Sequence, residues 1–294
     1  MRTIVGVLRG GPGQEYDESL KSGAHVLEAL NREKYEPRDI FIDRAGQWHA
    51  QGLPRSPELA LKGVEVAFNA LHGPYGEDGS LQRTLEKLDV PYTGSGPFAS
   101  AIAFNKHHAK ETLARLGVKV AHGQVVERGD TEKLAHQLFR TMPHPVIIRP
   151  AGGGMGAEAT KAESFEALQF GLDRVFDLSP RALVEEYIKG KEAAVGVIDG
   201  FRGEETYALV PQPSTFTHEE KAALTDAAKK VHRGLELSHY SHSDFVVSKR
   251  GIYFLAVHTQ PKLAKGSVLH DALAAVGAKL GDFVEHVLSL AKRR

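Results

Sequence analysis

Glycines and acidic residues alternate between residues 72 and 82 in a way that suits anion binding. This segment, HGPYGEDGSLQ, contains three glycines that allow backbone amides to approach an anion closely. Glu77 and Asp78 precede a helical pattern, where acidic side chains favour the positive end of the helix dipole. A second glycine-rich run, 151–156, follows a strand pattern and offers further amides for phosphate oxygens. Both runs are equally compatible with ordinary turns that hold no ligand.

Histidine and aspartate also gather near a predicted hairpin in the last quarter of the chain. They are His239, His242, Asp244, His258 and His270. Strand histidines with one aspartate form a chemically reasonable zinc site. The chain contains 15 histidines, however, so their proximity in sequence does not by itself select a metal site.

The elements that must position these residues form three parts. Residues 1–97 alternate strand, glycine turn and helix, which predicts a doubly wound parallel sheet of the α/β class. Strand patterns lie at Thr3–Leu8 and Val64–Leu71, and helical patterns at Leu20–Leu30 and Leu81–Leu88. Residues 98–188 form the second part, and residues 189–294 the third.

Strands and helices are also expected in the second and third parts. Those of the second part are a helix at Ala99–Leu116, strands at Val118–Val126, Val146–Arg149 and Ala182–Ile188, a further strand after the glycine run, and helices near Leu134–Phe139 and at Phe165–Phe176. Those of the third part are strands at Ala193–Ile198 and Tyr207–Val210, a helix at His218–Leu235, a hairpin of Ser243–Ser248 and Ile252–His258, and two closing helices.

Composition narrows the classes of function. The 37 lysines and arginines balance the 37 aspartates and glutamates, so no long-range field attracts nucleic acid or an anionic membrane. The absence of cysteine excludes disulfides, thiolate nucleophiles and cysteine–zinc sites. No apolar run approaches the length of a membrane span, and the N-terminus lacks a secretory pattern. We therefore expect a cytoplasmic protein with small-molecule partners, binding neither nucleic acid nor membrane.

The run 72–82, followed by PYTGSG at 91–96, closely resembles the D-alanine:D-alanine ligase family of ATP-grasp enzymes. The resemblance covers almost the whole chain and implies an ATP-grasp fold with an N-terminal doubly wound domain. It also implies that Glu15 holds the ammonium group of the first D-alanine, with Ser19 in the same loop, and that Ser267 holds the carboxylate of the second. Taken alone, a glutamate at a helix start such as Glu15 is more often a partner of the helix dipole.

The same resemblance implies an ATP site. Lys106 and Arg149 would reach the phosphates, although the family has lysine where this chain has Arg149. Arginine keeps the charge but differs from lysine in geometry. The remaining residues implied in nucleotide binding are Gly153 and Gly154 for the phosphates, Glu185, Glu186, Tyr187 and Ile188 for the adenine, and Glu192 for the ribose.

Several residues depart from the family pattern at the magnesium end of this site. Of the three usual Mg²⁺ ligands only Asp244 persists, because Ala256 and His258 occupy the other two positions. Alanine supplies no oxygen, and histidine suits softer metals than Mg²⁺. The Mg²⁺ site, with Asp244 and His258 as candidate ligands, is therefore expected to be weakened or absent.

Further departures affect catalysis directly. His242 replaces the arginine that the family uses to stabilise the oxyanion formed during peptide-bond formation. Lys262 replaces a glycine, the glycine-rich loop is shortened, and Pro211–Ser214 stands where the family has a lid over the site. All these differences point towards impaired turnover.

Three functional hypotheses follow. The first is an active ligase that forms D-alanyl-D-alanine for peptidoglycan precursors, using ATP and Mg²⁺. The second is a non-catalytic nucleotide-binding protein that keeps the fold, and the departures favour it for present activity. The third is a ligase for another amino or carboxylate substrate, which fits less well because the substrate-end residues are retained. The resemblance also allows a homodimer paired through the first domain.

Overall fold

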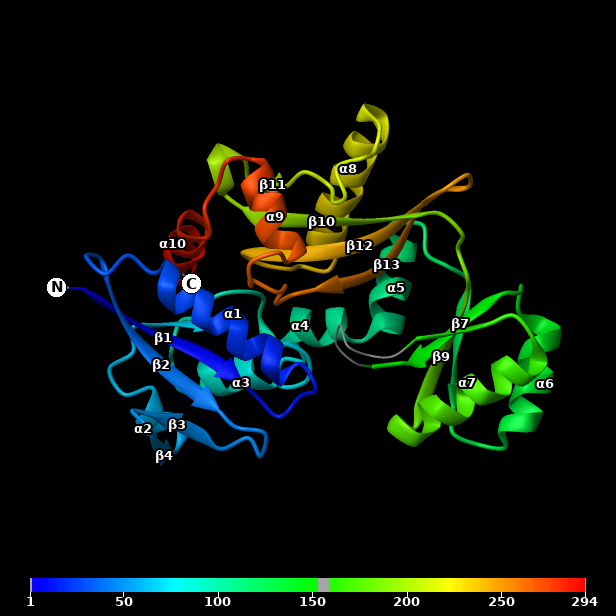
Figure 1. The fold of residues 1–294 in the computed structure, drawn as a ribbon, viewed down its shortest axis with the longest axis horizontal. Helices are drawn as coiled ribbons and strands as arrows, with labels where there is room; N and C mark the ends of the chain where they lie inside the picture. The colour runs from blue at the N-terminus through cyan, green and yellow to red at the C-terminus, as the bar shows by residue number, and fades with distance from the viewer. Residues whose placement is uncertain (1, 153–158, 294) are drawn as a thin grey trace.

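The computed structural model describes residues 2–152 and 159–293, whose strands form three sheets (Figure 1). We refer to them as the N-terminal sheet (β1–β5), the middle sheet (β6–β9) and the C-terminal sheet (β10–β13). Figure 1 shows the N-terminal and middle sheets at opposite ends of the molecule, with the C-terminal sheet between and above them.

The N-terminal sheet is mixed and has the order β4-β3-β2-β1-β5. Its parallel strands are β1 (Thr3–Gly10), β2 (Tyr35–Ile42) and β5 (Val66–Asn69). An antiparallel edge is formed by β3 (Trp48–Ala50) and β4 (Leu53–Arg55). The predicted parallel strands β1 and β5 are confirmed, and β3 and β4 add an antiparallel edge that was not predicted.

Helices α1 (Tyr16–Ala29), α2 (Pro57–Ala60) and α3 (Ser80–Lys87) accompany this sheet. The two acidic residues before α3 have different roles. Asp78 accepts a hydrogen bond from the backbone N–H of Ser80 at 2.8 Å, so it stabilises the helix start as expected. Glu77 is buried and points instead towards His258 of the C-terminal sheet.

Two helices link the N-terminal and middle sheets where the sequence predicted one. Helix α4 (Pro97–Phe104) ends at Asn105, and α5 (Lys106–Arg115) begins immediately after it. Asn105 has an extended backbone (φ −84°, ψ 98°), and its side chain accepts from the N–H of His108. Asparagine is favoured at helix N-caps, because its side-chain oxygen accepts a hydrogen bond from the backbone of the first turn. This explains the break within an otherwise helical pattern.

The middle sheet has the order β6-β9-β7-β8, and its neighbouring strands are antiparallel. The strands are β6 (Gly123–Glu127), β7 (Val146–Pro150), β8 (Thr160–Ala162) and β9 (Arg181–Glu186). The predicted strand at Val118–Val126 begins later than expected, and the one at Ala182–Ile188 ends earlier. Helices α6 (Thr131–Thr141) and α7 (Phe165–Leu178) pack on the sheet and share its hydrophobic core.

The C-terminal sheet has the order β11-β10-β12-β13 and is antiparallel. Its strands are β10 (Lys191–Asp199), β11 (Thr206–Ala208), β12 (Tyr240–Ser248) and β13 (Gly251–His258). The predicted hairpin of β12 and β13 is confirmed, with β12 starting earlier than expected. The accompanying helices are α8 (His218–Gly234), α9 (Val268–Ala275), α10 (Leu280–Ala291) and the 3-10 turn η1 (Phe201–Gly203).

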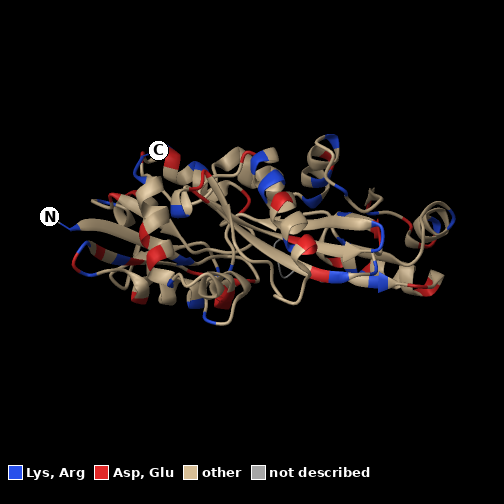
Figure 2. Ribbon diagram, turned by 90° about the horizontal axis from the view of Figure 1, so that it is seen from above, with Lys and Arg blue, Asp and Glu red and all other residues tan. Residues whose placement is uncertain are grey.

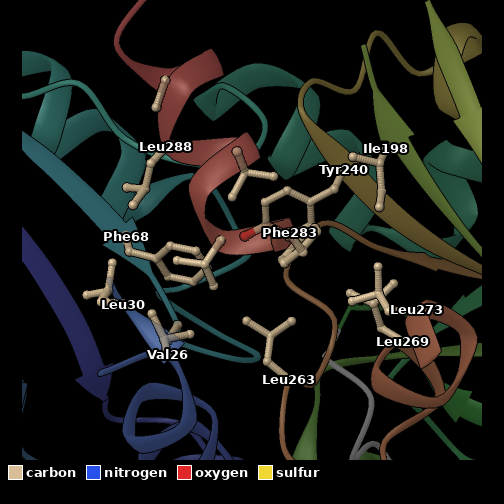
Figure 3. Packing of buried hydrophobic residues seen from close by; sticks show 14 of the residues in the cluster. Val26, Leu30, Phe68, Ile198, Tyr240, Leu263, Leu269, Leu273, Phe283 and Leu288 are labelled. Atoms are coloured by element: carbon tan, nitrogen blue, oxygen red, sulfur yellow. The ribbon is translucent and has the colours of Figure 1, made fainter. Parts of the chain in front are cut away.

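One hydrophobic core joins the N-terminal sheet to the C-terminal elements (Figure 3). Phe68 of β5 and Val26 of α1 belong to the same buried cluster as Tyr240 of β12 and Phe283 of α10. The rings of Tyr240 and Phe283 meet edge to face with centroids 5.1 Å apart. This shared core fixes the first loops of the chain relative to the hairpin.

Charges of both signs are interspersed along the molecule (Figure 2). No helix among the described residues combines the length and the apolar character that a bilayer crossing requires.

Candidate functional site

A cavity of about 540 Å³ lies between the middle and C-terminal sheets. Arg149 on β7 contributes to one side, and Asp244 on β12 with Ala256 on β13 to another. The loop of residues 211–214 also reaches the cavity, because Gln212 and Pro213 line it. That loop is held by paired backbone hydrogen bonds of 2.9 Å between Gln212 and Ala194.

The strand register places the histidines and Asp244 on one face of the hairpin. His242 lies directly opposite His258, and Asp244 lies opposite Ala256. Because alternate residues of a strand share a face, all four side chains point the same way. Nε2 of His258 donates to Oδ2 of Asp244 at 3.1 Å, and Nε2 of His242 lies 3.3 Å from Oδ1. Both oxygens of this carboxylate therefore face an imidazole.

Burial and these contacts determine the charge of each group. Burial alone would lower the pKa of His258, but the hydrogen bond to Asp244 and the approach of Glu77 outweigh it and raise the pKa to about 9. Burial lowers the pKa of His242 more than Asp244 raises it. For Asp244, the effect of burial is outweighed by the two histidines, so its pKa is lowered. At neutral pH the cluster thus contains one imidazolium, one neutral imidazole and one carboxylate.

These side chains do not fit Mg²⁺. The ion prefers oxygen ligands in near-octahedral geometry, and a histidine must be neutral to bind a metal. Asp244 supplies the only carboxylate on this face of the hairpin, both its oxygens contact imidazoles, and Ala256 opposite has no donor atom. We therefore derive no catalytic step through a metal at this hairpin.

The alternative of a replacement metal site is not supported. Within residues 2–152 and 159–293, no group of three or more histidine, aspartate or glutamate side chains is arranged to hold a metal ion. His239 lies elsewhere, where its Nδ1 accepts from the N–H of Gly94 at 3.1 Å. His270 contacts Asp271 on α9. His239 and His270 lie apart from the cluster of His242, Asp244 and His258, because His239 precedes β12 and His270 belongs to α9.

Arg149, one of the two predicted phosphate-binding cations, shares a buried carboxylate with Lys110. Glu185 is 2% exposed and contacts Lys110 through Oε1, while its Oε2 lies 3.1 Å from Nη2 of Arg149. Burial, reinforced by Arg149, lowers the pKa of Lys106 to about 8. Glu185 was expected to contact adenine, and sequence analysis missed its ion pairs because the two partners lie on α5 and β7, far from β9 in the chain.

The predicted adenine-binding segment follows β9. The backbone N–H of Glu186 donates to His122 O, and that of Tyr187 donates to Pro145 O, both at 2.8 Å. These two N–H groups are therefore already used within the protein. Ile188 is buried, and Glu192 lines the cavity. Gly153 and Gly154 lie outside the described residues.

At the substrate end, Glu15 packs against the loop after β5. Gly73 has a φ of +69°, and a Cβ added there would lie 2.3 Å from Oε2 of Glu15, so only glycine fits. Ser19 is fully buried, accepting from Gly10 N–H at 2.8 Å and donating to Ala70 O at 2.9 Å. Through these two bonds Ser19 connects the end of β1 to the segment after β5. Ser267 precedes α9 and donates to Lys262 O at 2.8 Å.

His72, in the loop after β5, contacts both α1 and the segment after β13. No role was expected for this histidine from the sequence. Nε2 of His72 lies 2.7 Å from Oγ of Ser22, and its Nδ1 lies 2.8 Å from Gln260 O. The hydroxyl of Ser22 also accepts from Leu263 N–H at 3.1 Å. Burial lowers the pKa of His72, which keeps the ring neutral. The only signal in the sequence was the position of His72 at the head of the glycine-rich run.

Comparison with known proteins agrees with this architecture. Residues 49–95 match the family model for the D-ala D-ala ligase N-terminus, and residues 112–212 match that for the C-terminus. The D-alanine–D-alanine ligase of Geobacter sulfurreducens is 34% identical over 97% of this chain and 93% of its own length. That of Syntrophotalea carbinolica is 33% identical over 99% and 96%, respectively.

Solved structures show the same fold. The D-alanine-D-alanine ligase from Coxiella burnetii superposes with a TM-score of 0.88 at 23% identity, covering 100% of this chain and 96% of its own. The VanG D-Ala:D-Ser ligase from Enterococcus faecalis gives 0.88 at 21% identity, covering 99% and 100%. The ATP-grasp fold expected from the sequence is thereby confirmed. With relatives more than 30% identical along nearly its whole length, the chain belongs to the D-alanine–D-alanine ligase family.

Proposed function

We propose that this protein is a D-alanine:D-alanine ligase-like ATP-grasp protein that binds ATP and D-alanine but is impaired in phosphoryl transfer. The observation that carries the proposal is the pairing of Asp244 with His242 and His258, opposite an alanine. In the family, Mg²⁺ neutralises the charge that develops as the phosphoryl group moves. Losing one electrostatic stabiliser of a transition state typically costs about 100-fold to 1000-fold in rate.

The remaining residues have roles that need no metal. Lys106 and Arg149 hold the phosphates, and Glu192 accepts from the ribose hydroxyls. Glu15 orients the ammonium group of the first D-alanine, and Ser267 holds the carboxylate of the second. The same proposal includes three domains, formed by residues 1–97, 98–188 and 189–294. It also includes a cytoplasmic location and a homodimer, as the family resemblance implies.

An active ligase is the alternative, favoured by one specific observation. Glu15 is buried against Gly73, and Ser267 stands at the start of α9, which supports intact contacts to the two D-alanines. In this alternative the carboxylate of the first D-alanine receives the γ-phosphoryl group of ATP. The amine of the second D-alanine then attacks the acyl phosphate, releasing phosphate and forming the peptide bond.

Measuring phosphate release from ATP in the presence of D-alanine during a Mg²⁺ titration distinguishes the impaired ligase from the active one. We expect release near background at every Mg²⁺ concentration. Robust Mg²⁺-dependent synthesis of D-alanyl-D-alanine would overturn the proposed impairment.

A double variant locates the defect. Ala256→Glu with His258→Asn restores two oxygen-bearing side chains, and we expect it to gain phosphate release. A gain assigns the defect to the metal end, whereas a folded variant without gain assigns it to His242 and the replaced lid. His218→Asn is the matched control, because His218 is exposed at the start of α8.

A further inference from the structure

The carboxylate that would seat a metal is held by buried partners on the cavity wall. Asp244 and Ala256 both line the cavity, and the two histidines lie two residues away on the same strands. His242 is 6% exposed and His258 is 4% exposed. An ion that displaced the hydrogen bond from Nε2 of His258 to Oδ2 of Asp244 would leave a buried N–H without a partner, which is costly. Nε2 of His242 lies 3.3 Å from the other carboxylate oxygen, Oδ1, and crowds the approach to it.

His258 also contacts a residue outside the hairpin. Nδ1 of His258 lies 3.9 Å from Oε2 of Glu77, which is buried in the loop before α3. Oε1 of the same carboxylate accepts from the N–H of Gly73 at 3.3 Å. A metal that displaced His258 would therefore disturb the N-terminal loop as well.

The opposite side of the cavity offers cationic groups to an anion. Arg149 lines the cavity, and its buried Nε has no hydrogen-bond acceptor within the described part of the chain. Its Nη2 contacts Glu185, so the guanidinium is oriented before any ligand arrives. Lys106 and Lys110 are 7% and 5% exposed in the same region. A phosphate oxygen would satisfy the Nε–H of Arg149 directly.

We propose that this cleft binds an adenine nucleotide as the metal-free anion in preference to its Mg²⁺ complex. The inference rests on the proposed function in taking the ligand to be an adenine nucleotide. Mg²⁺ on the phosphates competes with Arg149 and Lys106 for the same oxygens. It also meets a hairpin whose only carboxylate is engaged by His242 and His258.

Calorimetric titration with ADP, which this site cannot use as a phosphoryl donor, tests the inference on the unmodified protein. We expect ADP to bind about tenfold more tightly in excess EDTA than in saturating Mg²⁺, which corresponds to about 1.4 kcal/mol. Adenosine, which carries no phosphate, should show no dependence on Mg²⁺. Equal or tighter ADP binding in Mg²⁺ overturns this inference alone. Absence of ADP binding under both conditions overturns the proposed nucleotide site with it.

The double variant Ala256→Glu with His258→Asn provides the second test. It frees one oxygen of Asp244 and adds oxygen donors beside it, so we expect the preference to reverse towards the Mg²⁺ complex. His218→Asn should keep the wild-type preference. A folded double variant that still binds metal-free ADP more tightly would show that the contacts of His258 with Asp244 do not set the preference, and would overturn the inference.

Discussion

His258 connects two distant parts of the chain through its two ring nitrogens. Nε2 donates to Oδ2 of Asp244 at 3.1 Å, and Nδ1 lies 3.9 Å from Oε2 of Glu77. Asp244 belongs to β12, whereas Glu77 lies in the loop that leads into α3. The charge on one buried imidazole therefore affects both the hairpin and the N-terminal loop.

The stability contributed by His258 should depend on pH. Its pKa is raised from 6.5 to about 9 in the folded protein, so the contribution is fully present below 6.5 and is lost as the pH rises through about 9. His258→Gln should lower the free energy of unfolding below pH 6.5 by up to about 3 kcal/mol. The difference in free energy of unfolding between the variant and the wild type should shrink above pH 9. Urea denaturation of both proteins from below pH 6.5 to above pH 9 measures this difference.

The prediction concerns the difference in free energy of unfolding between variant and wild type. The stability of the wild-type protein alone is less informative, because two buried lysines change it with pH in the opposite direction. Burial lowers the pKa of Lys106 and Lys110 to about 8, so the folded protein gains stability as the pH rises from about 8 towards 10.5. These lysines are unchanged in His258→Gln. A difference that stays constant across the whole pH range would contradict the assigned imidazolium.

Removal of the Glu185 carboxylate should be strongly destabilising. Glu185→Gln leaves Lys110 and Arg149 as buried cations without their shared partner, and loss of one member of a buried pair costs about 3–5 kcal/mol. Glu186→Gln is the neighbouring control, because its partner Arg250 is 55% exposed and such pairs contribute about 0–1 kcal/mol. Equal free energies of unfolding for the two variants would refute the structural role of Glu185.

A methyl group at Gly73 should displace Glu15 and weaken D-alanine binding. The added Cβ would lie 2.3 Å from Oε2 of Glu15, and the positive φ adds about 1–2 kcal/mol of backbone strain. Gly46→Ala has similar strain, with a φ of +81° and no atom within 4 Å of the added Cβ. We expect Gly73→Ala to weaken D-alanine binding by about tenfold or more, or about 1.4 kcal/mol, with Gly46→Ala unchanged, as measured by calorimetry. Similar D-alanine affinities would argue against Glu15 as the ammonium partner.

Sequence patterns predicted most helices and strands that carry a clear period. The apolar strands β1, β5 and β7 and the hairpin of β12 and β13 were predicted close to their observed positions. Strand β2 was missed, because six of its eight residues are only half-buried or exposed and its Arg38 and Asp39 interrupt the alternation. The break at Asn105 was missed because a single capping side chain ends α4 within a continuous helical pattern.

The sequence by itself determined the family and the residue types along the cleft, including alanine at position 256 and histidine at position 258. Only the tertiary structure decided what the remaining groups contact. The register of β12 and β13 sets His242 and His258 on either side of Asp244, and the tertiary fold brings Lys110 of α5 beside Glu185 of β9. Local periodicity reports which face of an element is buried, whereas these pairings depend on register and on packing between residues far apart in the chain.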